Sequence, residues 1–339
     1  MISGPITSVT RTALLQARTH QLAGIAMTRA FSTNSHVVKV SSSERSSGFL
    51  NDKNLEIANR ALHADGLVVL EDVIEHQKLD LLNEKMVTDA LYLQGLGDKG
   101  PYNYNKGNIQ QDPPLTSTYF DSSIFLNPIA TQVTSSVLGP KPRLSFISSN
   151  SALPPSPLYP PSRQPVHSDA DFSHPSSPFA LVVNIPLITM TPENGSTEIW
   201  LGTHCFGKEC QEGEHGERAS GRIREGFLEQ RRKTRAPCQP VVQKGSVVVR
   251  DLRLWHAGMP NWGNDVRVML AMIHFSGWFR NPMDVNFSEH VKEELGKCSE
   301  DLRIQGKFVS EEKLLGSYLE GKYGNAYYFD QREKLDVEF

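Results

Sequence analysis

The sequence predicts a mainly β fold, either a barrel or a sandwich of short strands, with helices on both sides of it in the chain. The first observation is a run of about eight short strand-like stretches, most of them between positions 143 and 278, with turn residues between them. The second is the helical spacing of apolar residues before that run, at residues 52–65, 76–93 and 121–138. Strands gathered in one run, rather than alternating with helices, are typical of all-β layers.

The elements before the strands follow from local patterns. Residues 52–65 have one apolar face and end at Gly66, and residues 67–70 are apolar enough to predict a short buried strand. The helical patterns at 76–93 and 121–138 also end at glycine.

A polar stretch lies between the second and third predicted helices, where residues 101–114 read PYNYNKGNIQQDPP. This composition favours a surface loop. The alternative is a loop in which the amides of Asn108, Gln110 and Gln111 contact a ligand.

The strands are short and are bounded by proline, glycine and asparagine. They are predicted at residues 143–150, 179–188, 196–201, 241–250 (two strands around the Lys244-Gly245 turn) and 265–278. We expect the proline-rich loop at 154–165 to border a binding site, because ligand-binding residues often lie in loops at strand ends. Residues 207–235 are charged and predict a partly helical surface excursion, and residues 288–320 predict a helical tail.

Length and composition limit the class of protein. The chain has 339 residues, of which 38% are hydrophobic and 22% charged, enough for a substantial core in one domain. The net charge of −3 gives no basic face for nucleic acid, and no apolar run is long enough to span a bilayer. The four cysteines have neither a C-x-x-C pair nor zinc-ligand spacing, and they predict separate reduced thiols.

Residues 1–43 differ in composition from the remainder of the chain. They carry basic residues and many Ser and Thr, with no acidic residue before Glu44, which is typical of an organellar transit peptide. Residues 10–28 predict a basic amphipathic helix, and Arg29-Ala30-Phe31-Ser32 resembles a mitochondrial processing site. The alternatives are a disordered tail and a cytoplasmic location. We therefore expect one folded domain at residues 44–339.

The first candidate site is the pair His167 and Asp169, just after the proline-rich loop. On a strand, residues i and i+2 point to the same face, so the imidazole and the carboxylate are expected side by side. Such a pair supplies two of the ligands of a 2-His-1-carboxylate site, which holds non-haem Fe(II) in oxygenases. By itself the pattern is common, and a solvated strand end is the alternative.

The third ligand of such a site is expected from a histidine at the end of a later strand. His256 fits best, because it lies in a short loop after the apolar strand at 245–250. The weaker candidates lie at a turn, past a strand end, in the charged excursion and inside a core strand: His204, His174, His215 and His274, respectively.

Arg267 stands in an otherwise apolar strand. A buried arginine costs free energy unless it has an anionic partner. One partner is the far carboxylate of 2-oxoglutarate, which a guanidinium group binds through two hydrogen bonds. The other is a structural carboxylate, with Asp251 or Asp265 as candidates.

Together these motifs resemble the phytanoyl-CoA dioxygenase family of Fe(II)/2-oxoglutarate oxygenases, and in particular its fungal secondary-metabolism members. The resemblance covers about residues 55–280. It rests on Asp65-Gly66-Leu67-Val68-Val69-Leu70, Gln164-x-x-His167-x-Asp169, Asn194-Gly195-Ser196-Thr197, Gly202-Thr203-His204 and Trp255-His256-x-Gly258, with Arg267 eleven residues after His256. It implies a double-stranded β-helix, a jelly-roll or cupin-like barrel, with flanking helices.

The resemblance also implies roles for individual residues. His167, Asp169 and His256 are expected to bind the iron, and Arg267 the C5 carboxylate of 2-oxoglutarate. Cosubstrate or substrate contacts are implied for Gln164, Thr197 and Asn184. The carboxylate of Asp169 implies oxidation rather than halogenation, because halogenating relatives have a small residue there.

The predicted function is therefore that of an Fe(II)- and 2-oxoglutarate-dependent dioxygenase that uses O2 to oxidise a small molecule. Aromatic residues near the site predict a bulky, mostly apolar substrate, such as a fungal secondary metabolite or an acyl-CoA: Tyr102, Tyr104, Tyr119, Phe120, Tyr159 and Phe172. Only the basic run 231–233 is a candidate contact for a CoA group. The alternative is a non-catalytic metal- or ligand-binding protein on a cupin-like barrel. No nucleic-acid partner is expected, and a homodimer is left open.

Overall fold

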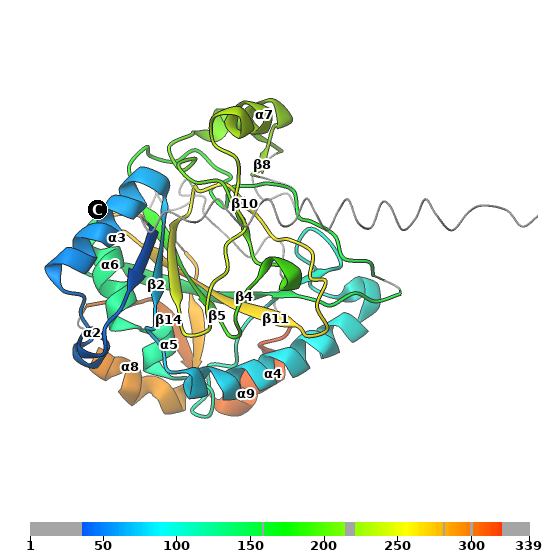
Figure 1. The fold of residues 1–339 in the computed structure, drawn as a ribbon. Coiled ribbons are helices and arrows are strands. Elements are labelled where there is room, and N and C mark those ends of the chain that lie inside the picture. The colour runs from blue at the N-terminus through cyan, green and yellow to red at the C-terminus, as the bar shows by residue number, and fades with distance from the viewer. Residues whose placement is uncertain (1–35, 158, 214–220, 281, 299–300, 321–339) are drawn as a thin grey trace, which may run out of the picture.

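The largest element of the fold is a mixed sheet. The computed structural model describes residues 36–157, 159–213, 221–280, 282–298 and 301–320. Across these residues the sheet has eight strands, in the order β1-β2-β9-β5-β11-β4-β13, with β3 also paired to β4 (Figure 1). The strands are β1 (Val37–Lys39), β2 (Leu67–Glu71), β3 (Asn108–Gln111), β4 (Arg143–Ala152), β5 (Ala180–Pro186), β9 (Val247–Asp251), β11 (Arg267–Phe275) and β13 (Arg303–Ile304).

Three pairs of shorter strands lie outside this sheet. They are β6 (Glu198–Ile199) with β10 (His256–Ala257), β7 (Gln211–Glu212) with β8 (Arg222–Ile223), and β12 (Val285–Ser288) with β14 (Gly306–Val309). Backbone bridges from His167 to both His256 and Arg222 join the first two pairs. The β6–β10 pair and the large sheet line one cavity from two sides. The two-layer arrangement confirms the predicted jelly-roll fold.

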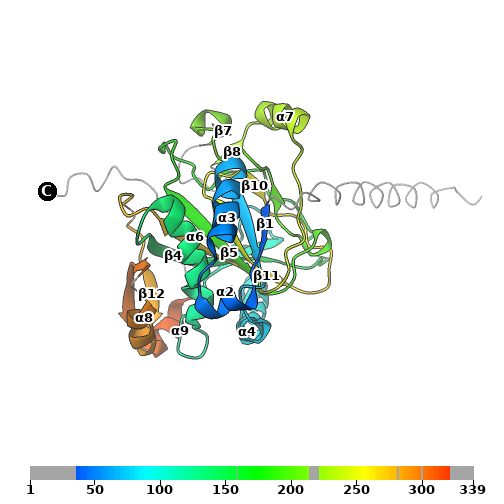
Figure 2. The same cartoon turned by 60° about the vertical axis from the view of Figure 1, so that its left-hand side comes forward.

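Helices cover the opposite face of the large sheet. The α-helices are α2 (Ser42–Ser47), α3 (Asp52–Asp65), α4 (His76–Gly95), α5 (Ser122–Phe125), α6 (Pro128–Leu138), α7 (Glu225–Thr234), α8 (Lys292–Cys298) and α9 (Glu311–Ser317). Helices α3 and α6 lie side by side and pack on β2, β5 and β9 (Figure 2). Helix α7 lies apart from the sheet, near β8 and β10 (Figure 1). In the described part of the chain, no helix has the length and apolarity needed to cross a membrane.

The alternation of side chains along the central strands separates the core from the cavity. On β9, Val247 and Val249 pack in the core on the helix side, while Val248 and Arg250 line the cavity. Strands β5 and β11 alternate in the same way, because successive side chains of a strand point to opposite faces. Each of these strands therefore contributes alternate side chains to the core and to the cavity.

Helix α3 has the bounds that the sequence predicts, and its two ends show why. Asn51 accepts a hydrogen bond from the backbone N–H of Asn54, which satisfies one of the free donors of the first turn. Gly66 ends the helix in the left-handed conformation, with φ of 75°. A Cβ atom at this position would lie 2.7 Å from Nδ1 of His204, so the glycine also permits the close packing of that side chain.

The prediction of a surface loop at 101–114 is wrong for its second half. Residues 108–111 form β3, pair antiparallel with β4 and are buried. The polar side chain of Gln111 is compatible with burial because its Nε2 donates to the carbonyl oxygen of Met86 at 2.8 Å. Met86 lies 25 residues earlier in the chain, so the local composition does not reveal this partner.

Other element boundaries also differ from the predictions. The expected helix at 121–138 is two helices, because Asn127 caps a new helix that starts at Pro128. Of the two strands expected at 241–250, only β9 forms, and Val242 makes a single bridge to Met190. The strand expected at 196–201 is reduced to the two residues of β6. The tail is not wholly helical, since β13 and β14 interrupt it.

The folded region begins earlier than residue 44. Strand β1 pairs in parallel with β2, and Val38 and Val40 are buried in the main core. The prediction that the whole of 1–43 stands outside the fold is therefore wrong for residues 36–43. Residues 1–35, including the expected amphipathic helix and processing site, lie outside the described residues, so mitochondrial import stays a prediction.

His274 is the buried core histidine that its place in an apolar strand predicts. It is 2% exposed, and its Nδ1 lies 2.8 Å from Oγ1 of Thr134. Burial lowers the pKa of His274 from 6.5 to about 3. The unfolded chain therefore takes up this proton at a higher pH than the folded one.

We expect the free energy of unfolding to fall as the pH drops from 6.5 toward 3, because protonation then favours the unfolded state. The slope from this one group is at most about 1.4 kcal/mol per pH unit. Urea unfolding of wild type and His274→Gln at several pH values measures it, and the variant should lack this component. Parallel pH profiles for the two proteins would contradict the assignment.

Candidate metal and cosubstrate site

The cavity between the two layers has a volume of about 90 Å³ and a mostly apolar lining. Its apolar walls come from β2, β5, β9 and β11 of the large sheet and from β6 of the short pairs. The polar and charged side chains that line it include those of Gln110, Gln164, His167, Asp169, Asn184, Thr197, Arg250 and His256. An apolar pocket with a few convergent polar groups is typical of a small-molecule site.

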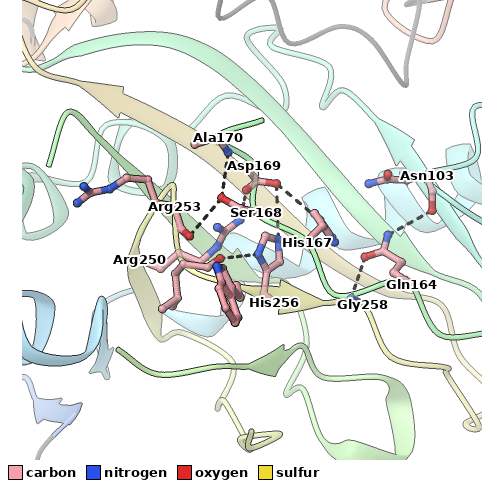
Figure 3. A network of polar contacts seen from close by, with 12 residues as sticks. Asn103, Gln164, His167, Ser168, Asp169, Ala170, Arg250, Arg253, His256 and Gly258 are labelled. Atoms are coloured by element: carbon pink, nitrogen blue, oxygen red, sulfur yellow. Dashed lines mark hydrogen bonds and ion pairs between the residues drawn. The ribbon is translucent and has the colours of Figure 1, made fainter. Parts of the chain in front are cut away.

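His167, Asp169 and His256 converge in this cavity (Figure 3). His167 and His256 lie opposite each other in an antiparallel bridge, with the N–H of each bonded to the carbonyl oxygen of the other. Oδ1 of Asp169 lies 3.7 Å from Nε2 of His167 and 3.6 Å from Nε2 of His256. One ligand atom from each residue lies within 4.8 Å of the others. This is a donor set of the 2-His-1-carboxylate type.

Each of the two histidines is oriented by a backbone carbonyl. Nδ1 of His167 lies 2.9 Å from the carbonyl oxygen of Pro165, and Nδ1 of His256 lies 2.9 Å from that of Leu254. A carbonyl oxygen only accepts, so the proton of each neutral ring is on Nδ1 and the lone pair of Nε2 faces the cavity. Metal-binding histidines are commonly oriented in this way.

The protonation states also suit a metal. Burial lowers the pKa of His167 and lowers that of His256 well below 6.5, so both rings are neutral near neutral pH. Burial raises the pKa of Asp169, but opposing electrostatic interactions, the largest of them with the Arg250 guanidinium, outweigh this effect and hold it below its ordinary value. Deprotonated ligands of both kinds are what metal binding requires.

Arg267 lies on the cavity-facing side of β11, the side that also carries Met269, Ala271 and Ile273. The side chain is 1% exposed, and burial lowers its pKa to about 10, so it remains charged. Nη1 donates to the carbonyl oxygen of Asn150 at 3.2 Å and Nη2 to that of Gly195 at 2.8 Å, while Nε has no partner.

No carboxylate among the described residues forms an ion pair with Arg267. Of the two structural partners that the sequence left open, Asp251 binds Arg253 instead, at 2.7 Å between Oδ2 and Nη2. A buried cation without a counter-ion is costly. The position is therefore suited to an anionic ligand.

Gln164 lines the cavity, but its amide is engaged by the backbone. Oε1 accepts a hydrogen bond from the N–H of Gly258 at 2.8 Å, and Nε2 donates to the carbonyl oxygen of Asn103 at 3.2 Å. A Cβ atom on Gly258 would lie 2.5 Å from Oε1, so this contact requires glycine there. The amide joins the segments before His167 and after His256, and a cosubstrate contact stays a prediction.

The other two predicted contact residues also line the cavity. Asn184, on β5, donates through Nδ2 to the carbonyl oxygen of Leu270 at 3.1 Å and accepts from Nε of Arg250 at 3.1 Å. Thr197 follows the turn whose Gly195 carbonyl binds Arg267. The roles of Asn184 and Thr197 toward a ligand stay predictions.

The other candidate histidines that the structure describes do not join the triad. His204 packs against Gly66, and His174 lies beside Phe172 and Phe179 in a small core. His215 lies outside the described residues.

The sequence does not predict two further contacts of the site, although Tyr104 is among the aromatic residues expected near it. Tyr104 packs its ring on that of His167, with 4.6 Å between the centroids, and its backbone has a φ of 65°. Arg250 donates through Nη2 to Oδ2 of Asp169 at 2.7 Å (Figure 3). The signal for Arg250 was present, because it is an arginine in an apolar strand just as Arg267 is.

Comparisons with known proteins show which family and which solved structures the chain is similar to. The family described as phytanoyl-CoA dioxygenase matches residues 62–269, which is more than half of the chain. Among solved structures, the chain is similar to SnoN, described as an epimerase in complex with Fe3+, alpha ketoglutarate and nogalamycin RO. The two share 14% identity with a TM-score of 0.52, and the match covers 67% of this chain and 85% of SnoN. It is also similar to ThoJ, described as a non-heme monooxygenase: 17% identity, TM-score 0.50, over 78% and 95%. EctD from S. alaskensis matches with 17% identity and a TM-score of 0.47, over 67% and 77%.

Proposed function

The chain belongs to the phytanoyl-CoA dioxygenase family and is an Fe(II)- and 2-oxoglutarate-dependent dioxygenase, and we propose that His167, Asp169 and His256 bind its iron and that Arg267 binds the C5 carboxylate of its cosubstrate. The observation that carries this proposal is the pairing of two features in one region. Three metal-binding groups converge in the cavity, and a buried guanidinium without a counter-ion lies on the same face of β11 as the cavity wall.

The residues present fit both groups. Two neutral imidazoles and one carboxylate are a donor set for Fe(II), and a buried arginine is the side chain best suited to a carboxylate. When bound together, iron, 2-oxoglutarate and O2 supply oxidation of a C–H bond, with succinate and CO2 as coproducts. The protein holds the ligands in place and surrounds them with apolar side chains that exclude water.

The reaction that we propose is hydroxylation or a related oxidation. Asp169 is a carboxylate that faces the two imidazoles, so it serves as the third protein ligand. Halogenation needs a place for a halide where this ligand sits. We therefore do not expect halogenated products.

We propose a bulky, mostly apolar small molecule as the substrate, of the kind found in fungal secondary metabolism. The basic run at 231–233 gives little support to an acyl-CoA, because two of its members are engaged within the protein. Arg231 donates to the carbonyl oxygen of Leu201, and Arg232 pairs with Glu225. Of the aromatic residues expected near the site, Tyr102, Phe120 and Phe172 are buried in the core. Tyr104 packs on His167, within the site.

Succinate release tests this function. Purified protein with Fe(II), ascorbate, 2-oxoglutarate and O2 is screened against polycyclic metabolites and acyl-CoAs. We expect succinate formation above the uncoupled background for an apolar polycyclic compound, with an oxidised product of matching amount. Stimulation by acyl-CoAs alone would contradict the substrate class, and the absence of 2-oxoglutarate consumption under every condition would contradict the proposed site.

A further inference from the structure

Arg250 is a buried cation to which the family resemblance assigns no role. It lies on β9, is 7% exposed, and its side chain faces the cavity. Nη2 donates to Oδ2 of Asp169 at 2.7 Å, and Nε donates to Oδ1 of Asn184 at 3.1 Å (Figure 3). Two hydrogen bonds therefore hold the guanidinium group of Arg250 within the site.

This contact makes the two oxygens of Asp169 inequivalent. Oδ1 faces Nε2 of His167 at 3.7 Å and Nε2 of His256 at 3.6 Å. Oδ2 instead accepts the hydrogen bond from Nη2 of Arg250. A charge-assisted hydrogen bond of this length is among the stronger polar contacts in a protein. Oδ1 is therefore the oxygen that faces the metal-binding nitrogens, while one lone pair of Oδ2 is engaged by Arg250.

The position of Arg250 is itself fixed by the sheet. Asn184 on β5 accepts from Arg250 and donates to the carbonyl oxygen of Leu270 on β11 at 3.1 Å. Asn184 is 3% exposed, and its strand pairs with both β9 and β11. The chain of contacts therefore runs from the backbone of β11 through two buried side chains to Asp169. Site residues braced by strands in this way hold their geometry closely.

We propose that Arg250 is a positioning residue that restricts Asp169 to binding the metal through one oxygen. The inference rests on the proposed function. A carboxylate binds a metal ion through one oxygen or through two. A three-residue facial site leaves three places open, and a chelating 2-oxo acid and O2 need all of them. A second oxygen from Asp169 would occupy one of these places.

The alternative is that Arg250 merely balances the charge of Asp169. The two roles predict different results when the side chain is removed. Loss of a counter-charge destabilises the ionised carboxylate and weakens the metal site. Loss of the positioning contact frees Oδ2 for the metal, so Fe(II) affinity is kept or increased while the chelation of a 2-oxo acid is impaired.

The test compares Arg250→Met, Arg250→Gln and Arg250→Lys with wild type in the absence of oxygen. Fe(II) affinity is measured first, and 2-oxoglutarate is then titrated into the Fe(II)-loaded protein by the visible charge-transfer band. For Arg250→Met we expect unchanged or tighter Fe(II) binding and a 2-oxoglutarate dissociation constant raised about tenfold or more. Arg250→Gln is neutral and shorter and should behave similarly, which gives a second folded variant. Arg250→Lys should restore part of the 2-oxoglutarate affinity.

Arg253→Met is the matched control. Arg253 is an equally buried arginine of the same segment, but it binds Asp251 rather than Asp169. At equal folded fraction, its Fe(II)·2-oxoglutarate band should match that of wild type. A general loss of packing would affect the control and Arg250→Met alike, and that outcome would overturn the inference.

Pyruvate, a 2-oxo acid without the C5 carboxylate, separates this contact from that of Arg267. The defect of Arg250→Met should persist with pyruvate, because the metal-chelating end is the same. A defect that disappears with pyruvate, or weaker Fe(II) binding in Arg250→Met, would overturn the positioning role. If wild type itself gives no band with 2-oxoglutarate, the proposed iron and cosubstrate site fails. A wild-type band that Arg250→Met retains in full rejects only the role of Arg250.

Discussion

Replacement of His256 by alanine is expected to abolish the visible band that Fe(II) and 2-oxoglutarate give with the wild-type protein in the absence of oxygen. Succinate release should fall by on the order of a hundredfold or more, at least as much as the loss of an outer partner of a metal ligand costs. The reason is geometric. Nε2 of His256 is one of the two nitrogens that face Oδ1 of Asp169, and its removal leaves two protein ligands.

His204→Ala is the control for this experiment. His204 is also a buried histidine, but it packs against Gly66 and takes no part in the triad. We expect its band and its succinate release to stay close to those of wild type. Fe(II) affinity measured directly, together with circular dichroism, separates loss of the metal from loss of the fold. A band retained in folded His256→Ala would reject this residue as a ligand.

The parts of the site that the sequence predicts are those fixed by local geometry. His167 and Asp169 share a face because they are two residues apart in an extended segment, and His256 follows a buried strand. Arg267 stands out because an arginine in an apolar strand needs an explanation in any fold. Each of these arguments uses only a few neighbouring residues.

The parts that the sequence does not predict depend on contacts between distant segments. The buried strand β3 looks like a polar loop until its pairing with β4 and the bond from Gln111 to Met86 are known. Arg250 carries the same local signal as Arg267, but nothing local shows that it binds Asp169, which is 81 residues earlier. The pairing of Asp251 with Arg253 is local, but nothing in the sequence shows that Asp251 binds Arg253 rather than Arg267.

The two cavity arginines therefore differ in a way that only the structure shows. Arg250 has a carboxylate partner within the protein, whereas Arg267 has only neutral carbonyl oxygens and an unpartnered Nε. In the unliganded protein, the charge of Arg267 is a cost rather than a source of stability. A ligand with a free carboxylate would remove this cost.

Arg267→Met is accordingly expected to weaken 2-oxoglutarate binding by about two to three orders of magnitude, or ~3–4 kcal/mol, the range for removing one partner of a buried charge pair. Fe(II) affinity should be unchanged, because Arg267 contacts none of the three metal-binding groups. Titration of 2-oxoglutarate into the Fe(II)-loaded protein measures the first quantity, and Fe(II) titration alone measures the second.

Thermal unfolding supplies an independent readout for the same variant. Without cosubstrate, Arg267→Met should be at least as stable as wild type, because it removes a buried charge that has no counter-ion. With saturating 2-oxoglutarate, wild type should gain stability in proportion to the logarithm of ligand concentration over the dissociation constant, and the variant should gain little.

Pyruvate should bind both proteins alike, since it has no carboxylate to reach this position. Equal 2-oxoglutarate affinity in the two proteins, or an unliganded variant that is less stable by several kcal/mol, would show that Arg267 is a structural residue rather than the cosubstrate anchor.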